Sequence, residues 1–282
     1  MEQEHNEVKC TFPIGTRIGD GLEVLGLLGQ GENGHVYKAR RLLLDQNVAI
    51  KILNFEKTVD DIAIQRFQKE ASLLATFDHP HIVKLLSFGT LHDGQYIGQP
   101  YMVLELLEGK TLAQILGEHG ALSQEDALPI FSAICQGLDY AHQRGIIHRD
   151  IKPANIMVLA DGPKILDFGV VKSLDPADQK LTKTGQLVGS ANYMSPEQCR
   201  SEKVDQRSDL YSLGCLMYET LTGKAPMDAD SSYAVMANQM EKVLTDVPAV
   251  HGISQSLRES VLKCLEKQPE KRYQSALELN KA

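Results

Sequence analysis

The sequence predicts an α+β protein in which short strands dominate the first part of the chain and helices the remainder. Before residue 107 one helical period covers 60–77, and the apolar runs of strand character cover 22–28, 35–39, 48–52, 82–88 and 101–106. After it the pattern is mainly helical, over 111–118, 123–144, 209–222 and the closing 276–282. A run of strands followed by a run of helices is typical of the α+β class.

Composition and charge favour a folded enzyme over a protein that binds nucleic acid. The 282 residues are enough for one large or two modest hydrophobic cores, and 43% of them are hydrophobic. The net charge is −8 and the chain contains no basic run. We therefore do not expect nucleic acid as a partner.

The cysteine spacing and the hydropathy of the sequence indicate where in the cell the protein is located. The five cysteines are widely spaced and form no CxxC pair, which indicates free thiols in a reducing environment. No stretch approaches the ~18 to 20 apolar residues of a membrane span. The segment 1–12 is polar and acidic, unlike a signal peptide, and we expect it to be a loose arm. We expect a cytoplasmic location, with no membrane contact from this segment.

A glycine-rich turn separates the first two predicted strands. Its string GQGENG holds Gly29, Gly31 and Gly34, and residues without a Cβ let backbone amides approach an anion, as in loops that cradle phosphates. A dinucleotide-binding loop would need a helix to open at the last glycine. Because a strand follows here, we exclude that alternative.

Two charged residues stand beside apolar patterns in the next elements. Lys51 lies inside the apolar alternation of 48–52, where an unpaired charge would be costly. Glu70 lies beside the apolar stripe of the helix over 60–77, which Asp60 can cap. Taken alone, Lys51 can equally be an edge lysine facing water and Glu70 a solvated surface charge.

Two short motifs are rejected on their context. His79 and His81 flank a proline, which suggests a metal site. No further ligands cluster with them in the sequence, and a Zn²⁺ site needs at least three protein ligands, so we reject it. Gly109-Lys110-Thr111 is half of a P-loop. That motif needs a glycine five positions earlier, and position 104 is leucine.

The stretch over 146–169 carries the clearest chemistry. The apolar runs 156–159 and 164–166 predict a hairpin, so Asn155 and Asp167 should face each other across the ladder. An amide oxygen and a carboxylate suit Mg²⁺ that also keeps waters and phosphate oxygens as ligands. Asp150 lies in the preceding loop, where it can face this pair. The hairpin considered alone is also compatible with a simple solvated turn.

The strings HRDIKPAN, from His148 to Asn155, and DFG, from Asp167 to Gly169, closely resemble the catalytic and metal-binding loops of eukaryotic-type protein kinases. The resemblance runs from about Leu22 to Tyr273 and is strongest to the bacterial serine/threonine kinases. It implies a bilobal fold, with a small antiparallel β-sheet lobe carrying one helix and a larger, mainly α-helical lobe. The lobes would cover 13–107 and 108–282, with ATP and Mg²⁺ in a cleft at the hinge; Mn²⁺ is a possible substitute.

The resemblance also assigns roles to residues. Asp150 would accept or orient the substrate hydroxyl, and Lys152 would steady the transferring phosphoryl group. Lys51 would pair the α- and β-phosphates and Glu70, while Asn155 and Asp167 would hold the metal. The nucleotide pocket implied in this way comprises Leu28, Gly29, Gln30, Gly31, Glu32, Asn33, Gly34, His35, Val36, Ala49, Lys51, Leu104, Glu105, Leu107 and Met157.

The segment after Asp167 resembles a kinase activation segment. It ends in GSANYMSPE, which resembles the substrate-binding platform, with Ser190 in place of threonine and Ser195 in place of alanine. The resemblance implies a buried pair between Glu197 and Arg272, and implies that Asp209 holds the backbone of the catalytic loop.

Regulation and acceptor type follow from the same region. Arg149 stands beside the catalytic aspartate and needs an anion, which a phosphate on Thr182 or Thr184 would supply; a second copy of the chain would add it. Lys152 and the short Ser190 predict protein substrates with serine or threonine acceptors.

Two other functions remain open from the sequence. A binding or scaffold protein of kinase shape would usually lack the equivalents of Lys51, Asp150 or Asp167, and all three are present. A kinase of small molecules would not need the peptide platform or the Lys152-Pro153 pair. We therefore expect an active serine/threonine protein kinase.

Overall fold

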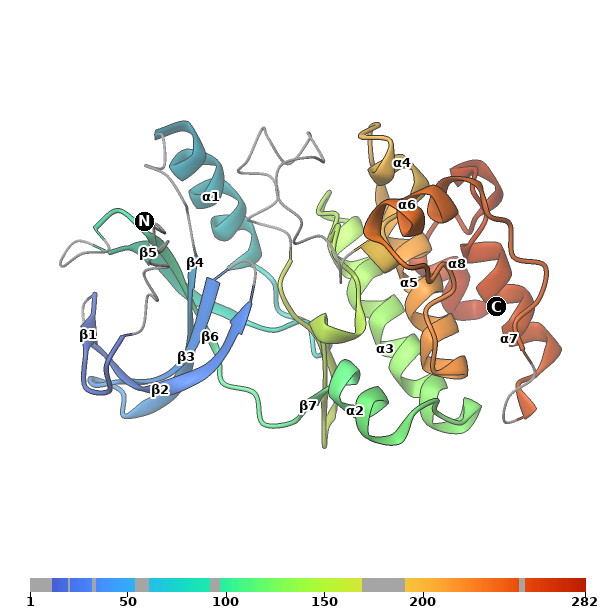
Figure 1. The fold of residues 1–282 in the computed structure, drawn as a ribbon. Helices are drawn as coiled ribbons and strands as arrows, with labels where there is room; N and C mark the ends of the chain where they lie inside the picture. Colours follow the sequence, from blue (N-terminus) through green and yellow to red (C-terminus); the bar gives the residue numbers. More distant parts are fainter. Residues whose placement is uncertain are drawn as a thin grey trace, which may run out of the picture. The chain divides into compact units, whose positions relative to one another are not determined.

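The computed structural model describes residues 12–19, 21–31, 34–53, 61–91, 97–168, 191–248 and 252–282, with side chains left out at 61–64, 66 and 70. The chain divides into two compact units (Figure 1). The first takes the described residues up to Phe77 together with Lys84–Leu107, and the second takes Asp78–Val83 together with Glu108–Ala282.

The first unit is a six-stranded antiparallel sheet with one helix, α1 (Asp61–Leu74). The strand order is β1-β2-β3-β4-β6-β5. The strand bounds are β1 (Arg17–Ile18), β2 (Leu22–Gly31), β3 (Gly34–Arg41), β4 (Gln46–Leu53), β5 (Leu85–Thr90) and β6 (Pro100–Glu105).

One face of this sheet carries the first unit's core. Its buried side chains include Val24, Tyr37, Ile50 and Val103, which meet at paired positions of the central strands. Because side chains alternate between the faces of a strand, Ala49 and Lys51 project to the opposite face. Elsewhere in the unit, α1 packs on β5 and β6, and the Phe67 ring meets the Phe88 ring edge to face, with 5.9 Å between their centroids.

The glycine-rich segment differs from the predicted turn. The sequence predicts a loop over 29–34, whereas β2 and β3 stay paired almost to its tip, with Gly29 opposite Val36 and Gly31 opposite Gly34. Glycine does not prevent backbone pairing, so the hairpin continues. Gly34 has a φ of 134°, and a Cβ there would lie 1.9 Å from the Ile52 carbonyl oxygen. The adjacent strand β4 therefore requires this glycine.

The second unit is mainly helical and has a small three-stranded sheet of order β7-β8-β9. The strands are β7 (Lys110–Thr111), β8 (Ile156–Leu159) and β9 (Gly162–Ile165). The helices are α2 (Leu112–His119), α3 (Gln124–His142), α4 (Pro196–Cys199), α5 (Gln206–Thr222), α6 (Ser232–Glu241), α7 (Gln255–Cys264) and α8 (Ala276–Lys281).

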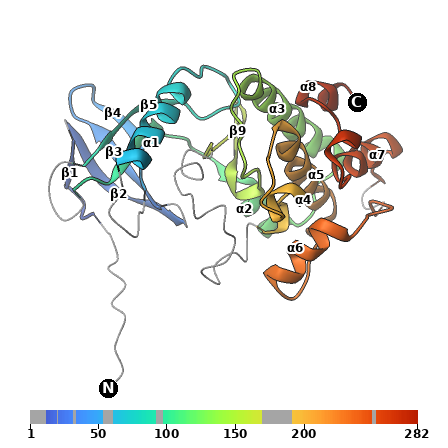
Figure 2. The ribbon, with the colours of Figure 1, turned by 90° about the horizontal axis from the view of Figure 1, so that it is seen from above.

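Helix α5 is the centre of the second unit's core. It packs on α3 and α7, beside which it lies in both Figure 1 and Figure 2. Most of its residues are buried, as its apolar sequence predicts, and it ends at Gly223 with a left-handed φ of 75°. At Gly214 a Cβ would lie 2.6 Å from the Cys264 Cβ, so glycine lets α5 and α7 approach closely.

The segment Asp78–Val83 corrects the predicted strand over 82–88. The Val83 N–H donates to the Ile165 carbonyl at 3.0 Å, and the Ile165 N–H donates to the His81 carbonyl at 2.9 Å. These bonds make a short parallel bridge between Ile82 and β9 of the second unit. Strand β5 of the first sheet therefore begins only at Leu85.

Side-chain caps mark the helix starts in the second unit. Thr111 and Ser123 cap α2 and α3, each accepting a backbone N–H of the first turn, so α2 begins one residue later than the predicted helix over 111–118. Among the described residues, no helix has both the length and the apolar character that crossing a bilayer requires.

Candidate active site

The β8–β9 hairpin places Asn155 and Asp167 at its open end, but one position out of the predicted register. Gly162 begins β9 directly after a two-residue turn, so Leu159 pairs with Gly162 and Ile156 with Ile165. Leu166, not Asp167, therefore lies opposite Asn155, and its N–H donates to the Asn155 carbonyl at 2.8 Å. Asp167 follows with a left-handed φ of 53°, a region that aspartate tolerates better than most residues.

Asp209 of α5 holds the backbone of the loop that contains His148 and Arg149. This buried carboxylate accepts the N–H of His148 and the N–H of Arg149, both at 2.8 Å. The His142 Nε2 lies 2.7 Å from the same carboxylate. Burial alone would raise the pKa of Asp209, but the hydrogen bond and charge of His142 lower it, so the carboxylate stays ionised.

His148 links the loop to the end of β9. Its Nδ1 accepts the Asp150 N–H at 3.2 Å, and its Nε2 lies 2.7 Å from the Leu166 carbonyl oxygen. Burial lowers the pKa of His148, so the ring is neutral. A neutral ring whose Nδ1 accepts must carry its hydrogen on Nε2, which then donates to Leu166. The ring also packs on Phe168, with 4.7 Å between centroids.

Asp150 is oriented by Lys152 and Asn155. The Lys152 Nζ lies 3.0 Å from the Asp150 Oδ2. The Asn155 Nδ2 donates to that same oxygen at 3.0 Å and to the Asp150 carbonyl at 2.8 Å. The short 3-10 turn Pro153–Asn155 brings the amide back to the aspartate. The geometry thus unites three of the predicted site residues.

The same arrangement bears on metal binding. Because both donated bonds of Asn155 go to Asp150, the amide turns its Oδ1 away from that aspartate. No described residue donates to this oxygen. This amide oxygen, which has no donor among the described residues, and the carboxylate of Asp167, two residues after the end of β9, are the kinds of oxygen ligand that fit Mg²⁺.

Four predicted nucleotide residues share one face of the first unit's sheet. Val36 pairs with Lys51, and Ala49 pairs with Leu104, so all four side chains stand on the face opposite the core. Lys51 is only 4% exposed. The register therefore combines apolar side chains and one buried cation in a single patch.

The remaining residues of the predicted nucleotide pocket lie on several different elements. Leu28 is 53% exposed on β2, and Gln30 pairs with His35 near the hairpin tip. The Glu105 Oε1 accepts the Lys84 N–H at 2.8 Å at the end of β6, and Leu107 ends the first unit. Met157 lies on β8 opposite Lys164. The predictions that fall outside the described residues or side chains concern Glu32, Asn33, the Asp60 cap, Glu70, Thr182, Thr184 and Ser190.

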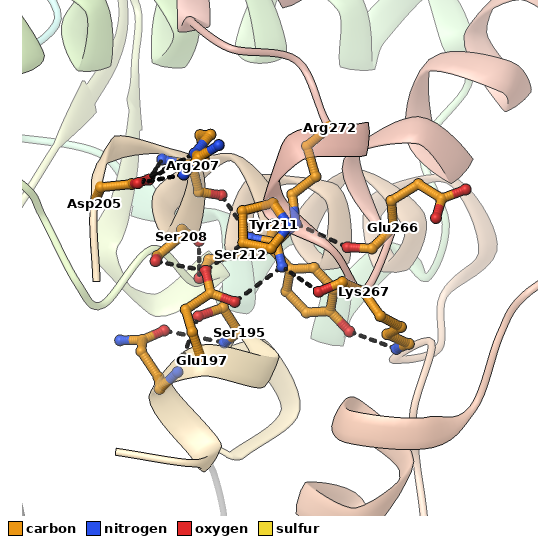
Figure 3. Close-up of polar contacts among 12 residues, drawn as sticks. Ser195, Glu197, Asp205, Arg207, Ser208, Tyr211, Ser212, Glu266, Lys267 and Arg272 are labelled. Carbon is orange, nitrogen blue, oxygen red and sulfur yellow. Dashed lines mark hydrogen bonds and ion pairs between the residues drawn. The ribbon is translucent and has the colours of Figure 1, made fainter. Parts of the chain in front are cut away.

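Arg272 and Glu197 form a buried ion pair (Figure 3). All five guanidinium N–H groups of Arg272 are used: two go to the carboxylate of Glu197, at 2.7 and 2.9 Å, and the others to the carbonyls of Arg207, Glu266 and Lys267. Ser208 also donates to Glu197, at 2.6 Å. Burial would raise the pKa of Glu197, but the bonds from Arg272 lower it, so the pair is ionic.

Arg149 has a left-handed backbone and a buried side-chain nitrogen. Its φ is 65°, and its buried Nε has no acceptor among the described residues. The backbone N–H is held by Asp209, as described above. A buried guanidinium nitrogen in this position is suited to an anion.

Sequence reasoning missed two glutamines that hold this region together. The Gln198 Nε2 donates to the Arg149 carbonyl at 3.0 Å. The Gln239 Nε2, fully buried on α6, donates to the carbonyls of Ala191 and Asn192 at 3.1 and 2.7 Å. The only hint in the sequence was the position of Gln198 three residues after Ser195, the spacing of a capping box.

Comparisons with known proteins agree on one family. A model described as the protein kinase domain matches residues 22–281. A probable serine/threonine-protein kinase of Clostridium perfringens is 41% identical over 268 residues, which is 94% of this chain and 38% of the relative. The serine/threonine-protein kinase PknB of Mycobacterium tuberculosis is 39% identical, over 94% of this chain and 42% of its own. The chain thus spans about two fifths of the length of these curated relatives.

Solved structures support the fold. The Mycobacterium tuberculosis PknI kinase domain superposes with a TM-score of 0.75 at 25% identity, covering 96% of this chain and 97% of that one. A likeness at this level of identity concerns the architecture, a small antiparallel sheet unit followed by a mainly helical one.

Proposed function

The chain belongs to the protein kinase family, and from that premise we propose that it transfers the γ-phosphoryl group of ATP to serine and threonine hydroxyls of proteins. The observation that carries this proposal is the orientation of Asp150 by Lys152 and Asn155. The curated relatives are named serine/threonine-protein kinases, which supports the same activity here.

The proposed chemistry uses each of these groups in a different way. The Asp150 carboxylate accepts or orients the hydroxyl hydrogen of the substrate, which raises the nucleophilicity of the oxygen. Lys152, 3.0 Å from that carboxylate, places a positive charge where the transferring phosphoryl group develops negative charge. Because Asn155 holds the aspartate, the base has one orientation when the substrate arrives.

The nucleotide would use the face of the first unit's sheet that lies opposite the core. Val36, Ala49 and Leu104 offer an apolar surface for the adenine, and the buried Lys51 beside them offers a charge for the α- and β-phosphates, with Glu70 as its partner. The glycine-rich hairpin would cover the phosphates. Backbone groups near Glu105 and Leu107 would bind the adenine edge.

Asn155 and Asp167 are the residues that would hold Mg²⁺, or Mn²⁺ in its place. When bound, the divalent ion neutralises part of the phosphate charge. The protein's share is to present the Asn155 Oδ1, turned away from Asp150, and the Asp167 carboxylate at the end of β9. The left-handed backbone of Asp167 contributes by redirecting the chain at that point.

Partners and location complete the proposal. Protein substrates and a second copy of the chain, for phosphorylation of the segment after Asp167, are the proposed partners. We place the protein in the cytoplasm, a location that the four cysteines among the described residues support, since all four are buried and free. Ser190 and the Glu197–Arg272 pair would form the peptide platform, since the pair anchors the segment that follows Ser190.

The test is phosphorylation of a generic protein substrate with labelled ATP. The Asp150→Asn variant should lose several orders of magnitude in turnover with little change in ATP affinity, because a base acts mainly in the transition state. Asp167→Asn should weaken Mg²⁺-ATP binding as well. Asp161→Asn, the same change on the exposed β8–β9 turn, is the matched control and should behave as wild type.

The outcomes separate the alternatives. Near-wild-type turnover of the Asp150→Asn variant would remove this residue from the mechanism. ATP binding without any transfer would favour a scaffold of kinase shape, and transfer to small molecules only would favour the small-molecule kinase. A peptide library read by mass spectrometry tests the acceptor, and predominant phosphotyrosine would contradict the serine/threonine assignment.

A further inference from the structure

The single-turn helix α4 carries a reciprocal hydrogen-bond pair at its start. The Gln198 N–H donates to the Ser195 Oγ at 3.3 Å, and the Ser195 N–H donates to the Gln198 Oε1 at 3.0 Å. Ser195 is fully buried. This capping box ties the side chain of Gln198 back against its own backbone.

The capping box fixes which way the Gln198 amide faces. The Ser195 N–H needs an acceptor, so the oxygen of the amide must point toward it and the nitrogen must point away. That nitrogen lies 3.0 Å from the Arg149 carbonyl oxygen, to which it donates. A flipped amide would place nitrogen against the Ser195 N–H and oxygen against a carbonyl, losing both bonds.

The peptide between Arg149 and Asp150 is therefore held on both sides. Its carbonyl accepts from Gln198 at 3.0 Å, and its N–H donates to the His148 Nδ1 at 3.2 Å. Arg149 has a left-handed φ of 65°, a strained conformation for a residue with a Cβ, which persists only where surrounding contacts demand it. The next residue along the chain is Asp150.

Helix α4 is itself firmly anchored. Glu197, the neighbour of Gln198, carries the buried ion pair with Arg272 and the bond from Ser208 that Figure 3 shows. Helix α4 is therefore a rigid support for Gln198. The hydrogen bond from Gln198 to the Arg149 carbonyl makes the position of the catalytic loop depend on the position of α4.

We propose that Gln198 is a positioning residue, which fixes the peptide plane before Asp150 and makes the orientation of this carboxylate depend on the seating of α4. The proposal rests on the proposed kinase activity and assigns a side chain through which the close of the activation segment controls the base. The backbone N–H of Ser195 sets the orientation of the Gln198 amide, and any residue other than proline at this position would supply that donor.

The test compares Gln198→Met with Ser195→Ala. Methionine has a similar length but neither donates nor accepts strongly, so it removes the bond to Arg149. The Ser195→Ala variant loses the side-chain cap of α4. It keeps the bond from the backbone N–H of residue 195 to the Gln198 Oε1 and the bond from the Gln198 Nε2 to the Arg149 carbonyl. We expect Gln198→Met to lower kcat about tenfold or more with the KM for ATP unchanged, and Ser195→Ala to stay within about twofold of wild type.

A purely structural role predicts a different pattern. If Gln198 only stabilised α4, both variants would lose thermal stability and kcat together, and this result would overturn the proposal. A wild-type kcat in Gln198→Met would overturn it as well. Should that variant fail to fold, Gln198→Glu takes its place, because it keeps an acceptor for the Ser195 N–H but sets an oxygen against the Arg149 carbonyl; the same loss of kcat is expected.

A second measurement does not depend on activity. Hydrogen exchange of the Asp150 amide, which donates to His148, should speed up in the Gln198 variants but not in Ser195→Ala. Unchanged exchange would contradict the proposal even in an inactive protein. An inactive wild type with faster exchange in the Gln198 variants would instead contradict the kinase activity and leave the positioning role intact.

Discussion

The hydrogen-bond acceptors around Arg272 require an arginine at this position. Each of its five N–H groups has an acceptor, and two of these acceptors belong to a buried carboxylate. Lysine carries the same charge but has three donors at a single point, so it cannot serve Glu197 in a bidentate manner and reach three carbonyls as well.

We therefore expect Arg272→Lys to lower the free energy of unfolding by about 2–3 kcal/mol, and Arg272→Leu by about 3–5 kcal/mol because Glu197 is then left buried and unpaired. Urea denaturation measures both changes. Arg200→Lys is the matched control: its pair with Glu202 spans 3.9 Å at the surface, and the expected change is under about 0.5 kcal/mol. Equal losses at positions 200 and 272 would contradict this account.

Arg149 leads to a second prediction at this scale. Its buried Nε has no acceptor among the described residues. A phosphothreonine at 182 or 184 would supply about −1.5 to −2 charges and bidentate acceptors. The Thr182→Ala/Thr184→Ala double variant should lose about tenfold or more in turnover on an external substrate, and phosphatase treatment of wild type should have the same effect.

Peptide mapping by mass spectrometry reports the occupancy of these threonines. Ser256→Ala, on the exposed surface of α7, controls for loss of a hydroxyl and should leave turnover unchanged. Full turnover of the dephosphorylated protein would rule out the switch while leaving the kinase assignment in place.

At the scale of elements, the β2–β3 hairpin separates two reasons for a glycine. A Cβ at Gly34 would meet the Ile52 carbonyl oxygen at 1.9 Å, and the φ of 134° excludes other residues as well. At Gly29 nothing lies within 4 Å of a built Cβ. The two glycines of one motif thus answer to different constraints, the packing of strands at one position and open space at the other.

Gly34→Ala should therefore lower the free energy of unfolding by about 1–3 kcal/mol, since the strands must shift to admit the methyl group. Gly29→Ala should change it by less than about 0.5 kcal/mol. Thermal or urea unfolding decides between them. The comparison fails if the two alanine variants are equally stable, or if Gly29→Ala is the more damaged.

The elements also show where reading the sequence succeeds. Apolar periodicity predicted α2, α3, α5 and α8 of the second unit and strands β2 to β6 of the first, because this signal is local. Helices α4, α6 and α7 and the two-residue strand β1 were not predicted. The hairpin over 156–166 was predicted with its register one position out, since the turn length depends on whether Gly162 belongs to the turn or the strand, and here it begins β9. The strand predicted over 82–88 begins only at Leu85, because the Val83 N–H donates to the carbonyl of Ile165, which lies 82 residues away along the chain.

In the candidate active site, too, contacts between residues close in sequence were predicted, and the contacts of two glutamines with distant residues were not. Asp150, Lys152 and Asn155 come together because they are close in sequence, and a motif can carry them. Gln198 and Gln239 reach backbone carbonyls 49 and 48 residues away, and no spacing rule encodes such a contact. Their discovery required the fold.

At the scale of the whole molecule, the net charge bears on substrate choice. The chain carries −8 in total, so positively charged peptides should associate faster than neutral ones. Raising the ionic strength from about 0.05 to 0.5 M should lower kcat/KM for a basic peptide about threefold or more, with little change for a neutral peptide of the same acceptor sequence. Steady-state kinetics on the matched peptides measures this, and equal salt effects on both would contradict it.

The division into units has a consequence for attempts to dissect the protein. The polypeptide passes from one unit to the other at Phe77/Asp78, at Val83/Lys84 and again at Leu107/Glu108, so neither unit is a continuous piece of chain. A fragment that starts at Glu108 leaves behind the residues that bond Ile165, and β9 would then present an open edge to solvent. Open strand edges invite pairing between molecules, so such a fragment is a poor candidate for independent expression, whereas one that restores 78–83 in register would close the edge again.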